Sequence, residues 1–147
     1  MSGILFDTSV YISALRQGEE VILTLRRAAR AGEKGTRPLW LSAVVLEELY
    51  AGAIDPKSRR AFEKMERDFS KADRLLIPGQ SDWTLAGQVL AKIGLKYGFE
   101  QIGRARLTND ALIAMSCARH GFTVLTRNVS DYARIAEFRP FTWELIP

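Results

Sequence analysis

The chain has 147 residues, 47% of them hydrophobic, which suffices for one well-buried core and is too short for two ordinary domains. We therefore expect a single domain over residues 1–147. Charged residues make up 26%, and no segment is dominated by Pro, Gly or Ser, which argues against a disordered chain. One cysteine excludes an intramolecular disulfide and a zinc site of several cysteines, and the net charge of +4 permits a nucleic-acid partner without requiring one.

The chain is not expected to enter a membrane. Apolar runs such as 43–46 and 111–115 fall far short of the ~20 residues that span a bilayer. The first residues have no basic region, and Asp7 follows too early for a secretory signal. We therefore expect a cytoplasmic protein.

Short apolar runs alternate along the chain with longer segments whose apolar residues repeat at about 3.6 residues. This alternation is typical of an α/β fold, in which helices flank a parallel sheet. The predicted strands are 3–6, 39–42, 75–77, 122–126 and 141–146. The predicted helices are 10–16, 19–32, 43–53, 56–72, 83–97, 110–120 and 130–138.

One helical pattern predicts a stripe of core side chains. Its apolar residues are spaced three and four apart, as on one face of a helix. The stripe consists of Trp83, Ala86, Leu90, Ile93 and Tyr97.

Residues 98–109 show no clear period and are predicted to form a loop. The loop carries Arg104 and Arg106 just before an acidic helix start. It is either a substrate-facing segment or a surface connector whose arginines only solubilise it. Under the first interpretation Arg104 and Arg106 are candidate substrate-binding residues, and Arg127, just after the fourth predicted strand, is a third.

Asp7 follows the apolar run 4–6 and precedes a helical pattern, so we expect it at the carboxyl end of the first strand. In open α/β sheets, ligands bind at that edge. The alternative is a helix cap, because an Asp at this position accepts hydrogen bonds from free backbone amides.

Glu48 lies within the predicted helix 43–53, where Ser42 is the natural N-cap. Its neighbours three and four residues away are apolar or small, so its carboxylate shares a face with groups that avoid water. Periodicity alone does not choose between Glu48 and the adjacent Glu47.

Asp110 is expected to open an almost wholly apolar helix, and Asp131 to start the helix after the fourth strand. Each position has a simple explanation, because an acid in the first turn of a helix is favoured by the dipole. Thr108 and Asn109 are further cap candidates for the first of these helices.

Taken together, these four carboxylates come from distant segments that the predicted sheet brings to one end. At ~5 Å and an effective dielectric of ~20, each like-charged pair costs on the order of 3 kcal/mol. A divalent cation removes that repulsion, and Mg²⁺ and Mn²⁺ prefer oxygen ligands. The sequence therefore predicts a metal site formed by Asp7, Glu48, Asp110 and Asp131.

Other chemistries fit the sequence less well. The single histidine, His120, precedes Gly121 at a predicted helix end and cannot provide the paired acid and base of a metal-free ribonuclease. An Asp-nucleophile phosphatase is a rival, but Ser9 stands where such enzymes usually carry a second acid. A non-catalytic RNA-binding or interaction module is the other alternative, although it gains nothing from four clustered acids.

Four sequence blocks resemble the successive motifs of PIN-domain proteins, and most closely those of the VapC-like toxins of type II toxin–antitoxin systems. The blocks occur in family order and cover nearly the whole chain. They are residues 1–10 (MSGILFDTSV), 48–52 (ELYAG), 109–114 (NDALIA) and 126–132 (TRNVSDY).

The resemblance implies a three-layer α/β/α sandwich with a mainly parallel five-stranded sheet. It also implies a Mg²⁺- or Mn²⁺-dependent endoribonuclease that forms homodimers and has a cognate antitoxin encoded alongside. The family pattern Glu-Leu-x-x-Gly selects Glu48 over Glu47, and Ser9, Thr126 and Asn128 match polar residues that support the carboxylates. Tyr132 stands where the family often has Phe, a difference expected to be harmless.

The mechanism that follows is a hypothesis. Asp7 and Asp110 would ligate the principal ion, while Glu48 and Asp131 would complete its shell, hold a second ion or orient the attacking water. An antitoxin would block the site by placing a basic side chain or a short helix among the carboxylates.

Overall fold

The computed structural model describes residues 3–17, 37–103 and 105–146. The strands are β1 (Ile4–Phe6), β2 (Leu39–Ser42), β3 (Leu75–Leu76), β4 (Thr123–Thr126) and β5 (Thr142–Leu145). The helices are α1 (Thr8–Gln17), α3 (Ala43–Ala51), α4 (Pro56–Lys71), α5 (Gln80–Tyr97), the 3-10 helix η1 (Phe99–Gln101), α6 (Ala105–His120) and α7 (Val129–Phe138). The helix predicted at 19–32 lies outside the described residues.

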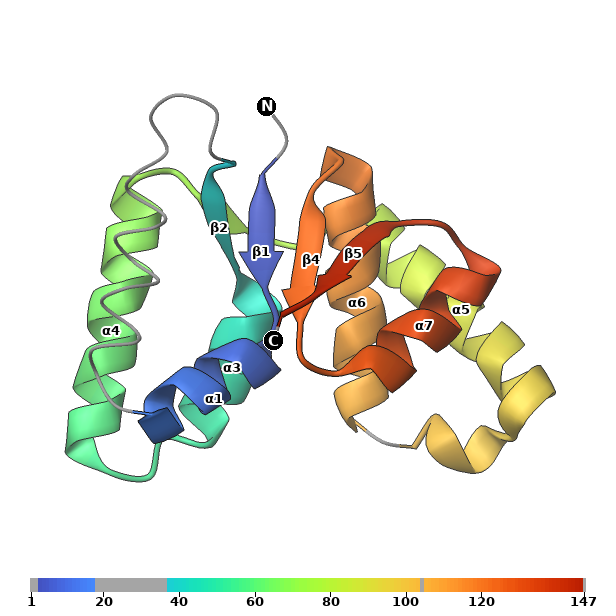
Figure 1. Ribbon diagram of the computed structural model, residues 1–147, viewed down its shortest axis with the longest axis horizontal. Helices are drawn as coiled ribbons and strands as arrows, with labels where there is room; N and C mark the ends of the chain where they lie inside the picture. Colours follow the sequence, from blue (N-terminus) through green and yellow to red (C-terminus); the bar gives the residue numbers. More distant parts are fainter. Residues whose placement is uncertain (1–2, 18–36, 104, 147) are drawn as a thin grey trace.

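All five strands form one parallel sheet in the order β3-β2-β1-β4-β5, which confirms the predicted α/β fold. The first strand is central, with β2 on one side and β4 on the other. The carboxyl ends of these three strands therefore lie side by side, and Figure 1 shows β1 and β4 pointing toward α1 and α3 at that end.

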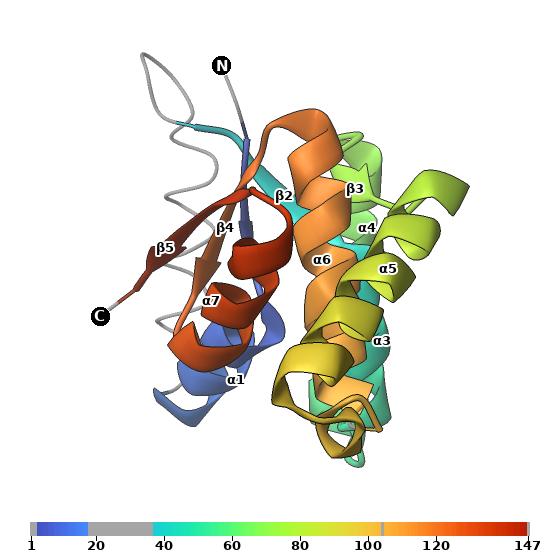
Figure 2. The same ribbon diagram turned by 90° about the vertical axis from the view of Figure 1, so that its right-hand side faces the viewer.

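The sheet is the middle layer of a three-layer sandwich. In Figure 2, α6 and then α5 lie on one side of the sheet, and α1 lies on the other. Strand side chains are buried on both faces, as expected of a covered parallel sheet, and Leu5, Leu41 and Val124 are fully buried. None of the described helices is long and apolar enough to cross a bilayer.

The helix α6 forms the centre of the core on its side of the sheet. Residues 111–115 and Cys117 are all buried, so the helix is apolar nearly all round. Cys117 is a core side chain, and its burial raises the pKa of the thiol to about 12, so the thiol stays protonated.

The predicted loop at 98–109 is wrong over most of its length. It contains η1, and α6 begins at Ala105, five residues before the predicted start at Asp110. Ala105 and Arg106 are good helix formers, and Leu107 is buried in the core, so packing extends the helix toward its N-terminus. Thr108 and Asn109 are therefore interior helix residues and not caps.

The predicted core stripe on α5 is right except for its first member. Ala86, Leu90 and Ile93 are buried and Tyr97 is half-buried, but Trp83 is 59% exposed. In this first turn of α5 the fully buried residue is the neighbouring Asp82, so the buried face of the helix passes beside Trp83.

The predicted helix ends at Ser42 and Gly121 are confirmed, and Asp55 caps a further helix. The amide of Val44 donates to the Ser42 side chain at 3.1 Å, and that of Ser58 to the Asp55 side chain at 3.0 Å, each an N-cap bond. At the end of α6, Gly121 has a φ of 69°, the left-handed conformation that glycine tolerates best.

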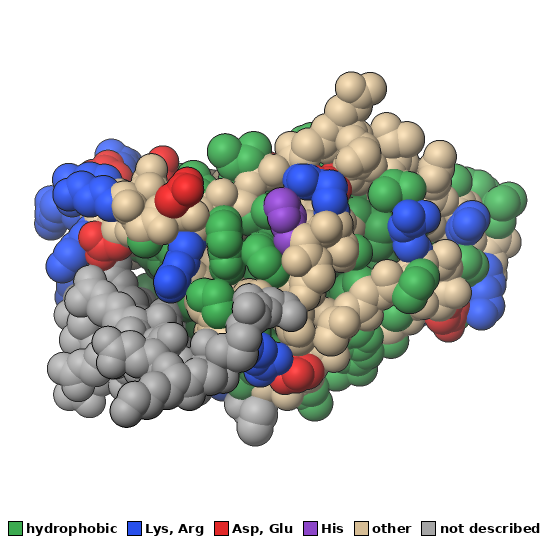
Figure 3. Space-filling view, turned by 90° about the horizontal axis from the view of Figure 1, so that it is seen from above, with side chains coloured by type: hydrophobic (Ala, Val, Ile, Leu, Met, Phe, Trp, Pro, Cys, Tyr) green, Lys and Arg blue, Asp and Glu red, His purple; other side chains and the backbone are tan. Residues whose placement is uncertain are grey.

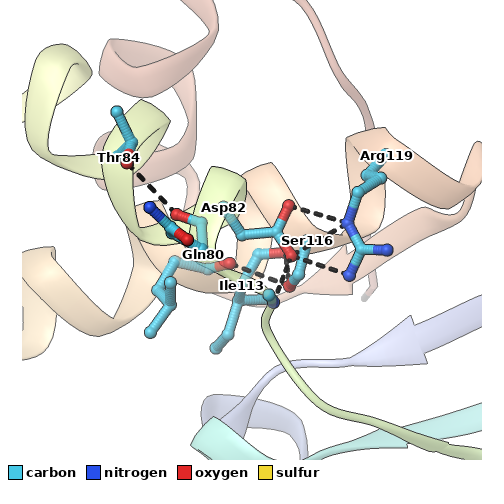
Figure 4. Close-up of polar contacts among 8 residues, drawn as sticks. Gln80, Asp82, Thr84, Ile113, Ser116 and Arg119 are labelled. Atoms are coloured by element: carbon cyan, nitrogen blue, oxygen red, sulfur yellow. Dashed lines mark hydrogen bonds and ion pairs between the residues drawn. The ribbon is translucent and has the colours of Figure 1, made fainter.

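A buried ion pair joins α5 to α6. Asp82 is fully buried, and Arg119 donates to its carboxylate at 2.8 Å and 3.0 Å, as Figure 4 shows. The same carboxylate accepts from the amide of Gly79 at 2.8 Å and so satisfies a free amide at the start of α5. The arginine and these bonds hold the pKa of Asp82 below its usual value, although burial opposes them.

Two substitutions test this pair. Asp82→Ala should lower the free energy of unfolding by about 1 to 2 kcal/mol, because the charge-assisted bond to the Gly79 amide is lost. Arg119→Met should be more destabilising than Asp82→Ala, because it leaves a buried carboxylate without its cation. Urea unfolding at pH 7 measures both, and the reverse order would contradict this account of the pair.

Candidate active site

A pocket of about 470 Å³ opens beside the carboxyl ends of β1 and β4. Its wall combines acidic, basic and hydroxyl side chains from α1, α3, α6 and the segment after β4. The acids are Asp7, Glu48 and Asp110, the bases are Arg106 and Arg127, and the remaining lining residues are Thr8, Ser9, Ile12 and Ser13.

Asp7 is the most firmly held of the acids. The Ser9 hydroxyl donates to its Oδ1 at 2.6 Å and the Thr126 hydroxyl to its Oδ2 at 2.6 Å. Asp7 is only 2% exposed, and burial raises the pKa of its carboxyl although these hydroxyls oppose the rise. Both oxygens are thus oriented by neighbours, one in the first turn of α1 and one at the end of β4.

The cap interpretation of Asp7 is also partly right. The residue directly precedes α1, and the amide of Val10 donates to its Oδ1. This bond is 3.4 Å long, much longer than the two hydroxyl bonds at 2.6 Å. The hydroxyl bonds therefore set the orientation of the carboxylate, with capping as a weaker contribution.

The structure places Glu48, and not Glu47, at the pocket. The Thr8 hydroxyl donates to Glu48 Oε1 at 2.7 Å, which joins α1 to α3. Glu47 is exposed and does not line the pocket. Thr8 itself was not among the predicted site residues, although its place between Asp7 and Ser9 was a signal.

Asp110 is the sixth residue of α6, so it does not open the helix as expected. It is 4% exposed, its Oδ1 accepts from the Tyr132 hydroxyl at 3.2 Å, and its Oδ2 is buried without a hydrogen-bond partner in the described part of the chain. Burial, followed by the charges of Asp7, Asp131 and Glu48, raises the pKa of Asp110 to about 8, against the lowering effect of Tyr132. All four predicted acids are thus close enough to interact.

Asp131 lies further from the centre of the site. It is half-buried in the first turn of α7 and does not line the pocket. The Asn128 side-chain amide donates to its Oδ2 at 3.1 Å. Asp131 therefore acts on the pocket through its charge.

The polar residues predicted to support the acids form two chains of hydrogen bonds that end at Asp7. Thr126 accepts from the amide of Asn128 at 2.8 Å and donates to Asp7. Ser9 accepts from the amide of Arg127 at 3.2 Å and donates to Asp7. The turn after β4 is thereby tied to the end of β1.

Two of the three predicted RNA-binding arginines reach the pocket. Arg106 and Arg127 line it, whereas Arg104 lies outside the described residues. Arg106 is one helical turn before Asp110 on α6, and its charge lowers the pKa of Asp7. The pocket is therefore acidic with a basic margin.

The single histidine is remote from this pocket. It is the last residue of α6, and its ring stacks on Phe122 with centroids 5.2 Å apart. Figure 3 shows the histidine on the face at the amino end of the strands, opposite to the acids. His120 is therefore unable to act as a general base in the pocket.

The pocket fits a divalent cation. Its donors are carboxylate oxygens, and Asp110 Oδ2 is a buried acceptor that lacks a donor. Within the described ranges, no group of three or more His, Cys, Asp or Glu side chains is arranged to hold one ion. Mg²⁺ usually keeps several waters and takes one or two carboxylates, so a site with fewer than three protein ligands is compatible with it.

Comparison with known proteins identifies the sequence pattern and the fold. A family model described as the PIN domain matches residues 4–137. No curated protein sequence matches the chain.

Solved structures share the fold over nearly the full length of both chains. The DNA-bound VapBC from Salmonella typhimurium is 19% identical over 99% of this chain and 98% of that chain, with a TM-score of 0.66. VapBC2 from Rickettsia felis, bound to a DNA fragment from its promoter, is 20% identical over 98% of each chain, with a TM-score of 0.64. VapBC-5 from Mycobacterium tuberculosis, a member of the VapBC family of toxin–antitoxin systems, is 21% identical over 99% and 98%, with a TM-score of 0.54.

The raised pKa of Asp110 predicts a pH-dependent stability. The pKa of the Asp110 carboxyl is 3.8 in the unfolded chain and about 8 in the folded chain. This difference stabilises the fold fully below pH 3.8, and the stabilisation is lost as the pH rises toward 8. With metal chelated, Asp110→Asn should therefore gain stability over wild type by roughly 1 kcal/mol for each pH unit between 5 and 8. Thermal and urea unfolding measure this difference, and one that does not change with pH would refute the burial of an ionisable acid here.

Proposed function

The chain belongs to the PIN-domain family, and from that premise we propose that it is a metal-dependent endoribonuclease and the toxin of a toxin–antitoxin pair. The observation that carries the proposal is the gathering of carboxylates from β1, α3 and α6 at one pocket, where Asp110 Oδ2 is buried without a donor. Such an arrangement is costly without a cation and favourable with one.

Under this proposal Asp7 and Asp110 hold a Mg²⁺ or Mn²⁺ ion, while Glu48 and Asp131 complete its surroundings or orient the attacking water. When bound, the ion would lower the pKa of a water and neutralise charge that develops on the phosphate. The chain contributes orientation, because Ser9 and Thr126 hold both oxygens of Asp7 and Thr8 holds Glu48.

The basic margin of the pocket supports a polynucleotide substrate. Arg106 and Arg127 line the same pocket as the acids, and guanidinium groups pair well with phosphate oxygens. We assign them to the phosphates that flank the scissile bond. The net charge of +4 favours approach of a polyanion in the same way.

The two rival functions are less well supported. A nucleophilic Asp7 needs an unencumbered oxygen, but hydroxyl donors engage both of its oxygens. A non-catalytic binding module has no use for a buried acid beside three others, an arrangement in which burial and then repulsion raise the pKa of Asp110 to about 8.

The toxin role is supported by the solved structures that share this fold, because they include VapBC complexes. We propose that a cognate antitoxin binds this chain and covers the pocket with a basic side chain or a short helix. The homodimer implied by the sequence resemblance is part of the same proposal, and size-exclusion chromatography with light scattering tests it.

The experiment that tests the enzymatic function is incubation of the purified protein with total RNA and Mg²⁺. We expect cleavage at defined positions, stopped by a chelator, and a loss of roughly 100-fold or more for Asp7→Asn, beyond what loss of a supporting residue costs. RNA binding without cleavage would instead identify a binding module. Metal-dependent hydrolysis of p-nitrophenyl phosphate without RNA cleavage would identify a phosphatase.

The pair Glu48 and Glu47 offers a matched comparison on one helix. Glu48→Gln should lower the rate of RNA cleavage by roughly 10- to 100-fold, because it removes a charge at the pocket. Glu47→Gln removes the same charge from an exposed position and should leave the rate unchanged. Initial rates at saturating Mg²⁺ compare the two variants, and equal rates would contradict the assignment of Glu48.

A further inference from the structure

We propose that Tyr132 is a positioning residue for Asp110, whose Oδ1 it holds through its hydroxyl so that Oδ2 is the oxygen offered to a divalent cation. This inference rests on the proposed function, because it concerns the ion that Asp110 would bind. It assigns a role to a side chain that lies behind the pocket and does not line it.

The contact is buried and specific. Tyr132 is fully buried, and its hydroxyl donates to Asp110 Oδ1 at 3.2 Å across 22 residues of sequence. A buried tyrosine hydroxyl needs a partner, and here the partner is one of the predicted metal ligands. A phenylalanine would fill the same space and leave Oδ1 without this donor.

Asp110 depends on this bond more than Asp7 depends on any one of its own. Asp7 accepts from two hydroxyls and from the amide of Val10. Among the described residues, the Asp110 side chain accepts only from Tyr132. Because the terminal torsion of an aspartate is broad, a carboxylate without this tether is free to rotate away from the orientation that the hydroxyl sets.

The tyrosine is well placed to act as a fixed support. It directly follows Asp131 on α7, and its ring packs near that of Phe141 with centroids 6.0 Å apart. Because the side chain is also fully buried, the ring has little freedom to move and its hydroxyl keeps a constant position. Tyr132 thus links the position of α7, which carries Asp131, to the orientation of Asp110 on α6.

The first test is a titration of Mn²⁺ into the purified full chain, followed by electron paramagnetic resonance of the free ion. Tyr132→Phe should weaken Mn²⁺ binding by roughly 10- to 100-fold, the usual effect of losing a group that orients a ligand. The matched control is Tyr97→Phe, which removes a hydroxyl from the carboxylate of Glu137, 2.7 Å away and exposed, and should bind Mn²⁺ as wild type does. Thermal unfolding of each metal-free variant checks its fold.

The outcomes separate this inference from the proposed function. Equal Mn²⁺ affinity in wild type and Tyr132→Phe would overturn the inference and leave the nuclease proposal standing. Wild type that binds no Mn²⁺, or binds it equally well after Asp110→Ala, would overturn the cation assignment and the inference with it.

A second measurement uses the unsubstituted sequence, so it stands even where Tyr132→Phe fails to fold. The chain has four tyrosines, and 3-fluorotyrosine labelling gives each a fluorine resonance, with the other three assigned by their own Phe substitutions. Saturating Mg²⁺ should shift the Tyr132 resonance, because the ion draws charge from the carboxylate that the hydroxyl binds. Tyr97 serves as the unshifted reference, and an unchanged Tyr132 resonance would overturn the inference.

Discussion

The structure depends on the repulsion among carboxylates collected at the carboxyl ends of β2, β1 and β4. Parallel strands necessarily bring their carboxyl ends together, so an acid after β1 and an acid on the helix after β2 become neighbours. Burial and then the neighbouring charges raise the pKa of Asp110 to about 8. Hydroxyl groups from Thr8, Ser9 and Thr126 hold Asp7 and Glu48 in place against this repulsion. The fold thus keeps these acids together at the expense of stability.

Two deeply buried acids in this molecule have carboxyl pKa values that are shifted in opposite directions. Asp82 is paired with Arg119, which keeps the pKa of its carboxyl below the usual value. Asp110 has no cation bonded to it among the described residues and is surrounded by other acids, so its pKa rises. Burial alone therefore does not identify a functional acid. The difference between them is the counter-charge, which the fold supplies to Asp82 and which, under the proposed function, the ion would supply to Asp110.

Expectations from the sequence failed where packing overrode a local pattern. The start of α6 moved from Asp110 to Ala105 because Leu107 packs in the core, so residues that read as caps became helix interior. Trp83 fitted a helical stripe but is 59% exposed, because the neighbouring Asp82 occupies the buried position in that turn. Both errors come from inferring burial from apolar periodicity, which does not register a buried polar residue or the packing that extends a helix. The strand positions were predicted well because each short apolar run was bounded by polar residues.

By itself the sequence determined the alternation of strands and helices, and thereby the parallel sheet and the edge at which its acids meet. It also determined the choice of Asp7, since a carboxylate directly after a buried strand can only stand at that edge. Periodicity left Glu48 and Glu47 open and the family resemblance favoured Glu48, but only the tertiary structure supplied the physical reason, the hydrogen bond from Thr8, 40 residues away in sequence. Only the tertiary structure brought the Tyr132 hydroxyl to Asp110, because contacts between two helices follow from how they pack and have no signature in either segment.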